Sequence, residues 1–344
     1  MIALIALIAT LAPADPWASQ ESGTKARLRG VSASGDRVAW ASGAGSTVIR
    51  TVDGGATWRG LAVPDSEGLD FRDVQALGDS AACLLAIGPG GKSRIYRTED
   101  AGATWTLAHL NRDPKGFLDA IAFWDLDHGL ALGDPVDGRY AVLTTDDGGR
   151  TWAKIADAGM PPALPGEGAF AASGTCLTVQ GTDLAWFGTG GGATARVFRS
   201  TNRGRTWAAS DTPIRAGNPS SGVFSIAFRD ADHGLAVGGD YTAEKDPGGN
   251  LALTHDGGRT WAPAGESRPS GFRSAVAFAP GSGGMRVVAV GPSGSDLSTD
   301  GGMSWAKLGA TGFHALAFGG GGAGWGVGER GRVARLDLKA PEKP

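Results

Sequence analysis

Acidic side chains stand in unusual surroundings at two places in the sequence. Asp134 lies in GDPVDGR (133–139), and Glu167 lies in PPALPGEGAF (161–170). Both are surrounded by apolar, Gly and Pro residues, where an acidic side chain has no evident solubilising role. Variable loops on a rigid frame commonly carry functional residues. Two carboxylates across a closed pocket could act as acid and base in glycoside hydrolysis. The same acids scattered along a flat rim would favour a binding platform.

The elements that position these acids are marked by an octapeptide that occurs six times. The copies begin at residues 51, 98, 145, 200, 254 and 298 and read TVDGGATW, TEDAGATW, TDDGGRTW, STNRGRTW, THDGGRTW and STDGGMSW. Three strand-like segments precede each copy and a fourth begins at its Trp, which predicts one four-stranded blade of a β-propeller per repeat. The Asp can accept hydrogen bonds from its own turn, and the fifth-position Gly can take a positive φ.

These boxes are therefore expected to be structural turns between the third and fourth strands. Asn202 replaces Asp in the fourth box and can still cap its turn. The residues at the two defining positions are Asp53 and Trp58, Asp100 and Trp105, Asp147 and Trp152, Asn202 and Trp207, Asp256 and Trp261, and Asp300 and Trp305.

The count of first strands predicts seven blades. These strands are expected to begin near Leu28, Arg72, Leu118, Ala172, Val223, Arg273 and His314. The last unit has three strands and no box, but residues 16–33 resemble residues 260–277, which places Trp17 where a Trp that follows a box should be. We therefore predict an all-β, seven-bladed propeller of four-stranded antiparallel blades, closed by the N-terminal segment. Residues 15–344 are expected to form this single domain.

The geometry of a blade predicts where function would lie. Turns after strands one and three share one face with the boxes, whereas the loops after strand two and the connections between blades share the other face. We expect a mixed acidic and arginine-bearing site on that second face. The candidate binding residues are Arg72, Asp119, Asp134, Asp137, Arg139, Glu167, Asp240, Tyr241 and Arg273, and those that could act in catalysis are Asp119, Asp134, Glu167 and Tyr241.

Several other functions find no support in the residues. The net charge of −3 and the absence of a Lys/Arg run argue against nucleic-acid binding. The Gly-rich runs at 86–93 and 188–193 lead into strands rather than helices, so neither predicts a nucleotide cofactor. His128 and His233 occupy equivalent turn positions, and the five His residues show no metal-ligand spacing. We therefore expect neither a cofactor nor a His-based metal site, although a metal joining Asp134, Asp137 and Asp240 stays open.

The N-terminus predicts export. Residues 2–12 are apolar and are followed by Ala12-Pro13-Ala14, which fits a signal peptide at residues 1–14 and is too short to span a bilayer. Because the first basic residue is Lys25, the missing basic region leaves the cleavage open. The mature chain is expected to be a periplasmic or secreted monomer with two buried thiols, Cys83 and Cys176.

The boxes resemble the Asp-box, or BNR, repeats of sialidases and related propellers. A sialidase-like mechanism would imply a Tyr nucleophile, a carboxylic acid and an arginine clamp, for which Tyr241, Glu167 and Arg72 are among the candidates. The family's F/Y-R-I-P segment is absent, because residues 28–31 read LRGV. A carbohydrate-active hydrolase, with a glycan as ligand, is therefore the alternative prediction.

A closer resemblance is to the exported BNR-repeat proteins related to the photosystem II stability/assembly factor. It covers about residues 28–336 and is carried by the seven-unit count and by the unit rhythm, as in IAFWDLDHGLALG…LTTDDGGRTW. This resemblance implies a non-catalytic platform with an arginine-rich patch that contacts protein partners. The chain departs from it in its mild acidity and dispersed arginines. We expect a binding or assembly factor for an envelope or membrane-associated protein.

Overall fold

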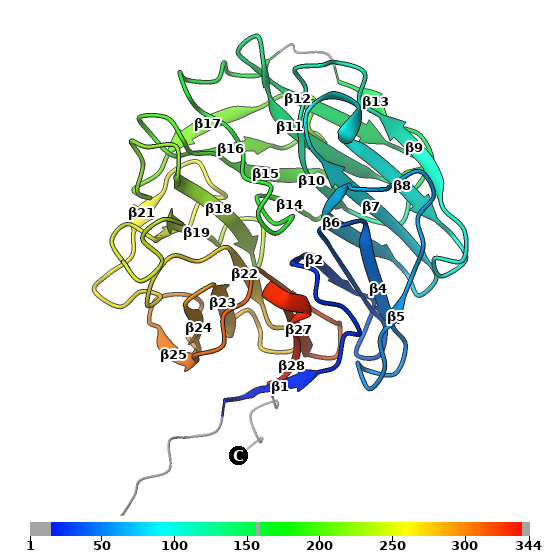
Figure 1. The fold of residues 1–344 in the computed structure, drawn as a ribbon. Helices are drawn as coiled ribbons and strands as arrows, with labels where there is room; N and C mark the ends of the chain where they lie inside the picture. The colour runs from blue at the N-terminus through cyan, green and yellow to red at the C-terminus, as the bar shows by residue number, and fades with distance from the viewer. Residues whose placement is uncertain (1–14, 156–158, 339–344) are drawn as a thin grey trace, which may run out of the picture.

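The computed structural model describes residues 15–155 and 159–338, and in this part of the chain seven four-stranded antiparallel sheets surround a central channel (Figure 1). Blade 1 contains β2 (Leu28–Ala33), β3 (Ala39–Gly43), β4 (Thr47–Thr51) and β5 (Arg59–Gly60). Blade 2 contains β6 (Asp70–Leu77), β7 (Ala81–Ile87), β8 (Arg94–Thr98) and β9 (Thr106–Leu110). Blade 3 contains β10 (Leu118–Phe123), β11 (Gly129–Val136), β12 (Arg139–Thr145) and β13 (Ala153–Lys154).

The remaining blades follow the same order from the channel outward. Blade 4 contains β14 (Leu177–Gln180), β15 (Leu184–Gly188), β16 (Arg196–Ser200) and β17 (Ala208–Asp211). Blade 5 contains β18 (Ser221–Phe228), β19 (Gly234–Asp240), β20 (Leu251–Thr254) and β21 (Ala262–Pro263). Blade 6 contains β22 (Ala275–Phe278), β23 (Val287–Gly291), β24 (Gly294–Ser298) and β25 (Ala306–Gly309). Blade 7 contains β26 (Ala315–Phe318), β27 (Ala323–Val327), β28 (Val333–Asp337) and β1 (Trp17–Gln20).

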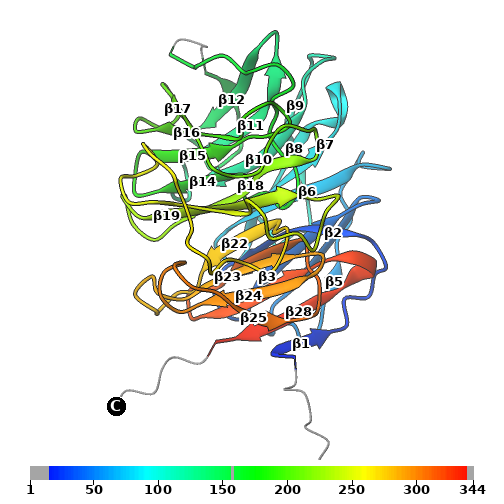
Figure 2. The same ribbon diagram turned by 90° about the vertical axis from the view of Figure 1, so that its left-hand side faces the viewer.

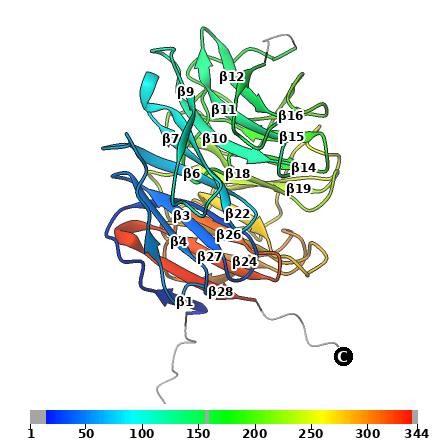
Figure 3. The same cartoon turned by 90° about the vertical axis from the view of Figure 1, so that its right-hand side faces the viewer.

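Blade 7 is built from both ends of the described chain. Strand β1 pairs antiparallel with β28, with Trp17 opposite Leu336 and Gln20 opposite Val333. The two strands lie side by side in all three views (Figures 2 and 3). The prediction of a seven-bladed, all-β propeller is confirmed. The predicted signal peptide at residues 1–14 lies outside the described residues.

The six box turns share one hydrogen-bond pattern. In the first box, Thr51 Oγ1 donates to Asp53 Oδ1 at 2.8 Å, and the backbone N–H of Gly55 donates to Thr51 Oγ1 at 2.8 Å. The backbone N–H and the hydroxyl of Thr57 then donate to the two oxygens of Asp53 at 2.9 and 2.6 Å. In the fourth box Asn202 Oδ1 still accepts from the backbone N–H of Thr206 at 2.9 Å, but the side-chain bond is reversed, since Asn202 Nδ2 donates to Thr206 Oγ1 at 2.8 Å.

The core lies between neighbouring blades, and the box tryptophans contribute to it. Trp105, from the box of blade 2, packs edge-on against the fully buried Trp40 of blade 1, with ring centroids 6.0 Å apart. Trp186 of blade 4 stacks on Phe228 of blade 5 at 3.8 Å. Because each blade buries its faces against its neighbours, the ring is held together by apolar contacts all around the channel.

Acid is expected to weaken the box turns. Hydrogen bonds from the side chains of Thr57 and Thr104 lower the pKa of Asp53 and of Asp100 to about 2. A depressed folded pKa stabilises the fold above the unfolded value of 3.8, and this contribution is lost as the pH falls towards 2. We expect the Tm to fall between pH 4 and pH 2, and Asp53→Asn, which mimics the fourth box, to remove part of that fall. Parallel thermal-melting profiles of the variant and the natural chain would contradict this explanation.

One predicted strand start is wrong. The first strand of blade 4 begins at Leu177 rather than near Ala172, because the chain from residue 170 to residue 176 leaves the blade and enters the central channel. The described residues include no helix able to cross a membrane; their only helical elements are the short 3-10 turns η1 (Gly90–Lys92) and η2 (Glu329–Gly331).

Candidate functional site

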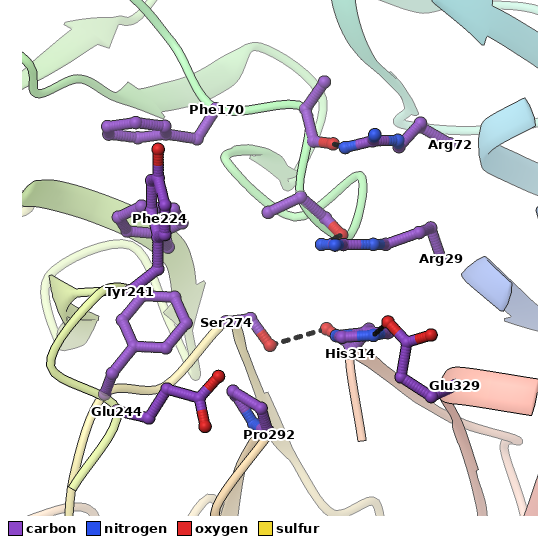
Figure 4. Close-up of a pocket in the computed structure, with 13 residues that line it drawn as sticks. Arg29, Arg72, Phe170, Phe224, Tyr241, Glu244, Ser274, Pro292, His314 and Glu329 are labelled. Atoms are coloured by element: carbon purple, nitrogen blue, oxygen red, sulfur yellow. Dashed lines mark hydrogen bonds and ion pairs between the residues drawn. The ribbon is translucent and has the colours of Figure 1, made fainter. Parts of the chain in front are cut away.

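A pocket of about 370 Å³ opens at the mouth of the central channel (Figure 4). Its walls come from the first strands of the blades, the loops after second strands and the connections between blades. The pocket therefore lies on the face opposite the box turns. The lining residues are Arg29, Arg72, Phe170, Ala171, Ala172, Phe224, Tyr241, Glu244, Phe272, Ser274, Pro292, His314 and Glu329.

A repeated irregularity of the first strands brings side chains to this mouth. In β2, β6 and β18 the pairing with the second strand shifts by one residue, and the residue that steps out of register is Arg29, Arg72 or Phe224. Such a bulge re-aims the side chain of the extra residue. All three side chains line the pocket. The bulges therefore direct equivalent side chains from three blades towards the same site, where they could contact a ligand.

Residues 170–176, which we term the channel segment, cross the channel beneath the pocket. Ser173 Oγ donates to the carbonyl oxygen of Ser274 in blade 6 at 2.7 Å. Gly174 lies directly against the side chain of Asp73 in blade 2, where a Cβ atom would have no room. Since one segment touches blades on different sides of the ring, it closes the channel, and the pocket ends blindly at this floor.

Two arginines form one wall of the pocket and hold the channel segment. Arg72 Nη1 donates to the carbonyl oxygen of Ala171 at 2.9 Å, and its Nε donates to Asp70 Oδ2 at 2.9 Å. Arg29 Nη1 donates to the carbonyl oxygen of Ala172 at the longer distance of 3.4 Å. Burial and the charges of the neighbouring Arg72 and Arg27 lower the pKa of Arg29 to about 10, so this wall concentrates positive charge.

Aromatic rings form the opposite wall, as Figure 4 shows. Phe170 stacks on Phe224 with ring centroids 3.9 Å apart, and Phe272 meets Phe224 edge-on at 4.7 Å. Tyr241 packs edge-on against Phe224 at 6.1 Å and remains 48% exposed. An exposed ring beside buried rings provides a rigid apolar surface for a ligand.

An imidazole and a carboxylate complete the polar side. His314 Nε2 and Glu329 Oε1 are 2.7 Å apart. Burial, assisted by the charge of Arg29, lowers the pKa of His314 to about 4, whereas the bond to Glu329 acts in the opposite direction. Burial raises the pKa of Glu329, but the bond to His314 and nearby positive charges lower it overall. At neutral pH this pair therefore consists of a neutral imidazole and a carboxylate, and the exposed Glu244 adds a second acid at the rim.

Of the residues predicted from the sequence, Arg72 and Tyr241 line the pocket. Glu167 does not, because its side chain is fully buried and pairs with Arg196. The same carboxylate accepts a hydrogen bond from Thr189 Oγ1 at 2.5 Å and another from the backbone N–H of Leu164 at 2.8 Å. These contacts tie the connection between blades 3 and 4 to blade 4, and they leave Glu167 no access to a ligand.

The other predicted residues lie in turns, in buried ion pairs or at the exposed edge of this face. Arg273 is fully buried and pairs with Asp296, while Asp137 forms an exposed ion pair with Lys115 at 3.0 Å. Burial raises the pKa of Asp240, but hydrogen bonds from Thr242, Ser220 and Asn218 outweigh it and lower that pKa to about 2. Arg139 is exposed and donates to the carbonyl oxygen of Met160 at 3.1 Å.

Asp119 and Asp134 are neighbours beneath the connection between blades 3 and 4. Asp134 is half-buried, its Oδ1 accepts from the backbone N–H of Ala169 at 2.9 Å, and burial raises its pKa. Asp119 is 1% exposed, and its Oδ2 has no hydrogen-bond partner in the described part of the chain. Burial, followed by the charge of Asp134, raises the pKa of Asp119 well above its usual value, which favours the protonated form of Asp119.

A neutral Asp119 should make stability fall with rising pH. The unfolded chain ionises this group above its usual pKa of 3.8, whereas the folded chain keeps the proton. Relative to Asp119→Asn, the free energy of unfolding should therefore fall by up to about 1.4 kcal/mol per pH unit between the unfolded pKa and the raised folded pKa of Asp119. Urea unfolding at several pH values measures this slope, with the exposed Asp137→Asn as control. Equal slopes for the natural chain and Asp119→Asn would refute the assignment.

Sequence reasoning missed Arg29, Phe224 and His314. Each occupies the same place in its repeat unit as Arg72, directly after an apolar residue (Leu28, Phe71, Val223 or Phe313) in or just before the first strand. Aligning all seven units at this position would have found them. Phe170 carried no comparable signal, because its place depends on the path of the channel segment.

The described residues contain no group of three or more His, Cys, Asp and Glu side chains that could hold a metal ion. This finding applies to Asp134, Asp137 and Asp240, which the sequence had left open. The Gly-rich run at 86–93 forms η1 and leads into β8, as a turn between strands does.

Similarity to known proteins lies in the fold. No family model matches the chain, and no curated protein is significantly similar to it. A structure described as YCF48 bound to D1 peptide aligns with a TM-score of 0.66 at 16% identity, covering 95% of this chain and 97% of that one. YCF48 from Cyanidioschyzon merolae aligns with a TM-score of 0.64 at 17% identity, covering 93% and 98%.

A second group of similar structures consists of enzymes. The GH74 xyloglucanase from Xanthomonas campestris aligns with a TM-score of 0.63 at 20% identity, covering 95% of this chain and 55% of the enzyme. The chain thus spans about half the length of that enzyme. The predicted resemblance to assembly-factor and sialidase-like propellers is confirmed for the fold.

Proposed function

We propose that this chain is an exported, non-catalytic binding propeller that holds a segment of a partner protein in the pocket opposite the box turns. The observation that carries this proposal is the composition of the pocket, in which two arginines face a cluster of aromatic rings. Aromatic and arginine side chains are enriched at the centres of protein interfaces. The expected partner is an envelope or membrane-associated protein. One similar propeller is described as bound to a D1 peptide, which supports the binding of a protein segment in general.

Glycoside hydrolysis is the second candidate, favoured by the likeness to GH74 enzymes and by two pocket carboxylates, Glu244 and Glu329. Two features count against it. Glu329 is already engaged by His314, and Glu167, the acid expected from the sequence, is fully buried in an ion pair. Turnover of aryl glycosides or polysaccharides that Glu244→Gln abolishes would favour the hydrolase.

The binding proposal is tested by a cross-linked pull-down of the tagged protein from its native envelope. Tyr241→Ala removes an exposed ring from the pocket, and Met303→Ala removes a 64%-exposed side chain from a box turn on the other face. We expect a specific partner that Tyr241→Ala loses and Met303→Ala retains. A partner that both variants retain, or no partner at all, would contradict the proposal.

A further inference from the structure

The pocket is closed at its inner end by the channel segment, so a ligand can enter and leave only through the open face. Polypeptide cannot pass through the ring at this point, because the channel segment is hydrogen-bonded to blades on different sides of the ring, through Arg72 in blade 2 and Ser274 in blade 6. The pocket volume of about 370 Å³ is at the small end for ligand sites. Such a blind pocket suits the end of a chain or a single projecting side chain.

Most hydrogen-bond donors of the Arg29 guanidinium lack an acceptor in the described part of the chain. The guanidinium carries five N–H donors, yet its single hydrogen bond within the described residues is the 3.4 Å contact with the carbonyl oxygen of Ala172. Its Nε is buried without an acceptor in that same part of the chain. The nearby acids are engaged elsewhere, since Asp70 accepts from Arg72 and Glu329 bonds to His314.

A largely buried cation without hydrogen-bonded compensation is costly, and an anion on the ligand would supply what is missing. Arg72 lies beside Arg29 on the same wall, so one carboxylate placed at this wall could accept from both guanidinium groups (Figure 4). Across the pocket, the exposed ring of Tyr241 and the ring of Phe170 offer an apolar surface.

We propose that the pocket recognises the free C-terminus of a partner chain that ends in an apolar residue. The terminal carboxylate would lie against Arg29 and Arg72, and the last side chain would lie against Phe170 and Tyr241. This inference rests on the proposed binding function and specifies which part of the partner enters. The blind floor favours a chain end over an internal stretch, because an internal stretch would need an exit.

The test uses the mature chain and fluorescein-labelled pentapeptide pools with the last residue fixed as Phe, Leu, Ser, Lys or Asp. Each pool is made with a free C-terminal carboxylate and with a C-terminal amide, and binding is measured by fluorescence anisotropy. We expect the Phe and Leu pools with free carboxylates to bind best, and amidation to weaken them by about tenfold or more.

Variants separate the two halves of the pocket. Arg29→Met should weaken the free-acid pools and leave the amide pools unchanged, whereas Arg29→Lys should retain part of the difference. Tyr241→Ala should weaken the Phe and Leu pools, and Leu126→Ala, an exposed residue on the box face, should change nothing. Thermal melting of each variant shows whether it is folded.

Three outcomes would overturn the inference. Acid and amide pools could bind equally, apolar pools could bind no better than Lys or Asp pools, or hydrocinnamate alone could bind as tightly as any peptide, which would point to a small carboxylate. Suppose that one of these outcomes occurs but Tyr241→Ala still abolishes recovery of the partner in the pull-down. The proposed binding function is then supported, and only the proposal of C-terminus recognition is wrong.

Discussion

Replacing Glu167 with alanine should lower the free energy of unfolding by about 3–5 kcal/mol, because it leaves a buried guanidinium without its partner. The Arg196 side chain is 10% exposed and that of Glu167 is fully buried. The change also removes the acceptor of Thr189 Oγ1 and of the backbone N–H of Leu164. Urea unfolding of the natural chain and the variant measures the loss.

The matched control is Asp137→Ala, which breaks the exposed ion pair with Lys115. There the side chains are 80% and 71% exposed, so the loss should be no more than about 1 kcal/mol. If Glu167→Ala lowers the free energy of unfolding by less than about 1 kcal/mol and also weakens partner binding, then Glu167 acts in the functional site. The structure instead assigns it to the support of the connection between blades 3 and 4.

Replacing Trp17 with alanine should cost about 3–5 kcal/mol, because it removes a buried ring from the only blade built from both chain ends in the described structure. The Trp17 side chain is 6% exposed, and its ring centroid lies 4.5 Å from that of Phe313. Its Nε1 donates to Ser295 Oγ at 2.9 Å, which links blade 7 to blade 6. Urea unfolding again gives the loss.

Trp17→Phe serves as the comparison, because it keeps most of the apolar body and removes only the bond to Ser295. Its loss should be clearly smaller than that of Trp17→Ala. If Trp17→Ala unfolds with the midpoint and slope of the natural chain, then the pairing of β1 with β28 contributes little to closing the ring.

The architecture could be predicted from the sequence because the information for it is local. Each box carries its own turn chemistry within eight residues, as the bonds between Thr51, Asp53 and Thr57 show. The count of first strands between and after the boxes then gives the number of blades. The prediction of seven blades needed no knowledge of distant contacts, apart from the likeness between residues 16–33 and residues 260–277.

The site was only partly predictable because it depends on contacts between distant residues. Glu167 has the sequence surroundings of a functional acid, but it lies in the connection between blades 3 and 4, and its partner Arg196 lies on β16. Likewise, nothing near residue 170 shows that the chain will cross the channel and bring Phe170 to Phe224. Loop composition can identify the functional face, whereas membership of the pocket depends on the paths of these segments.

The central claim is that the face opposite the boxes binds the partner, and site-specific photo-cross-linking tests it most directly. A benzophenone amino acid would be placed at residue 241 or, on the box face, at residue 303, since Tyr241 and Met303 are 48% and 64% exposed. After irradiation in the native envelope, we predict a discrete adduct from position 241 and none from position 303. The same adduct from both positions, or an adduct from position 303 alone, would contradict the claim.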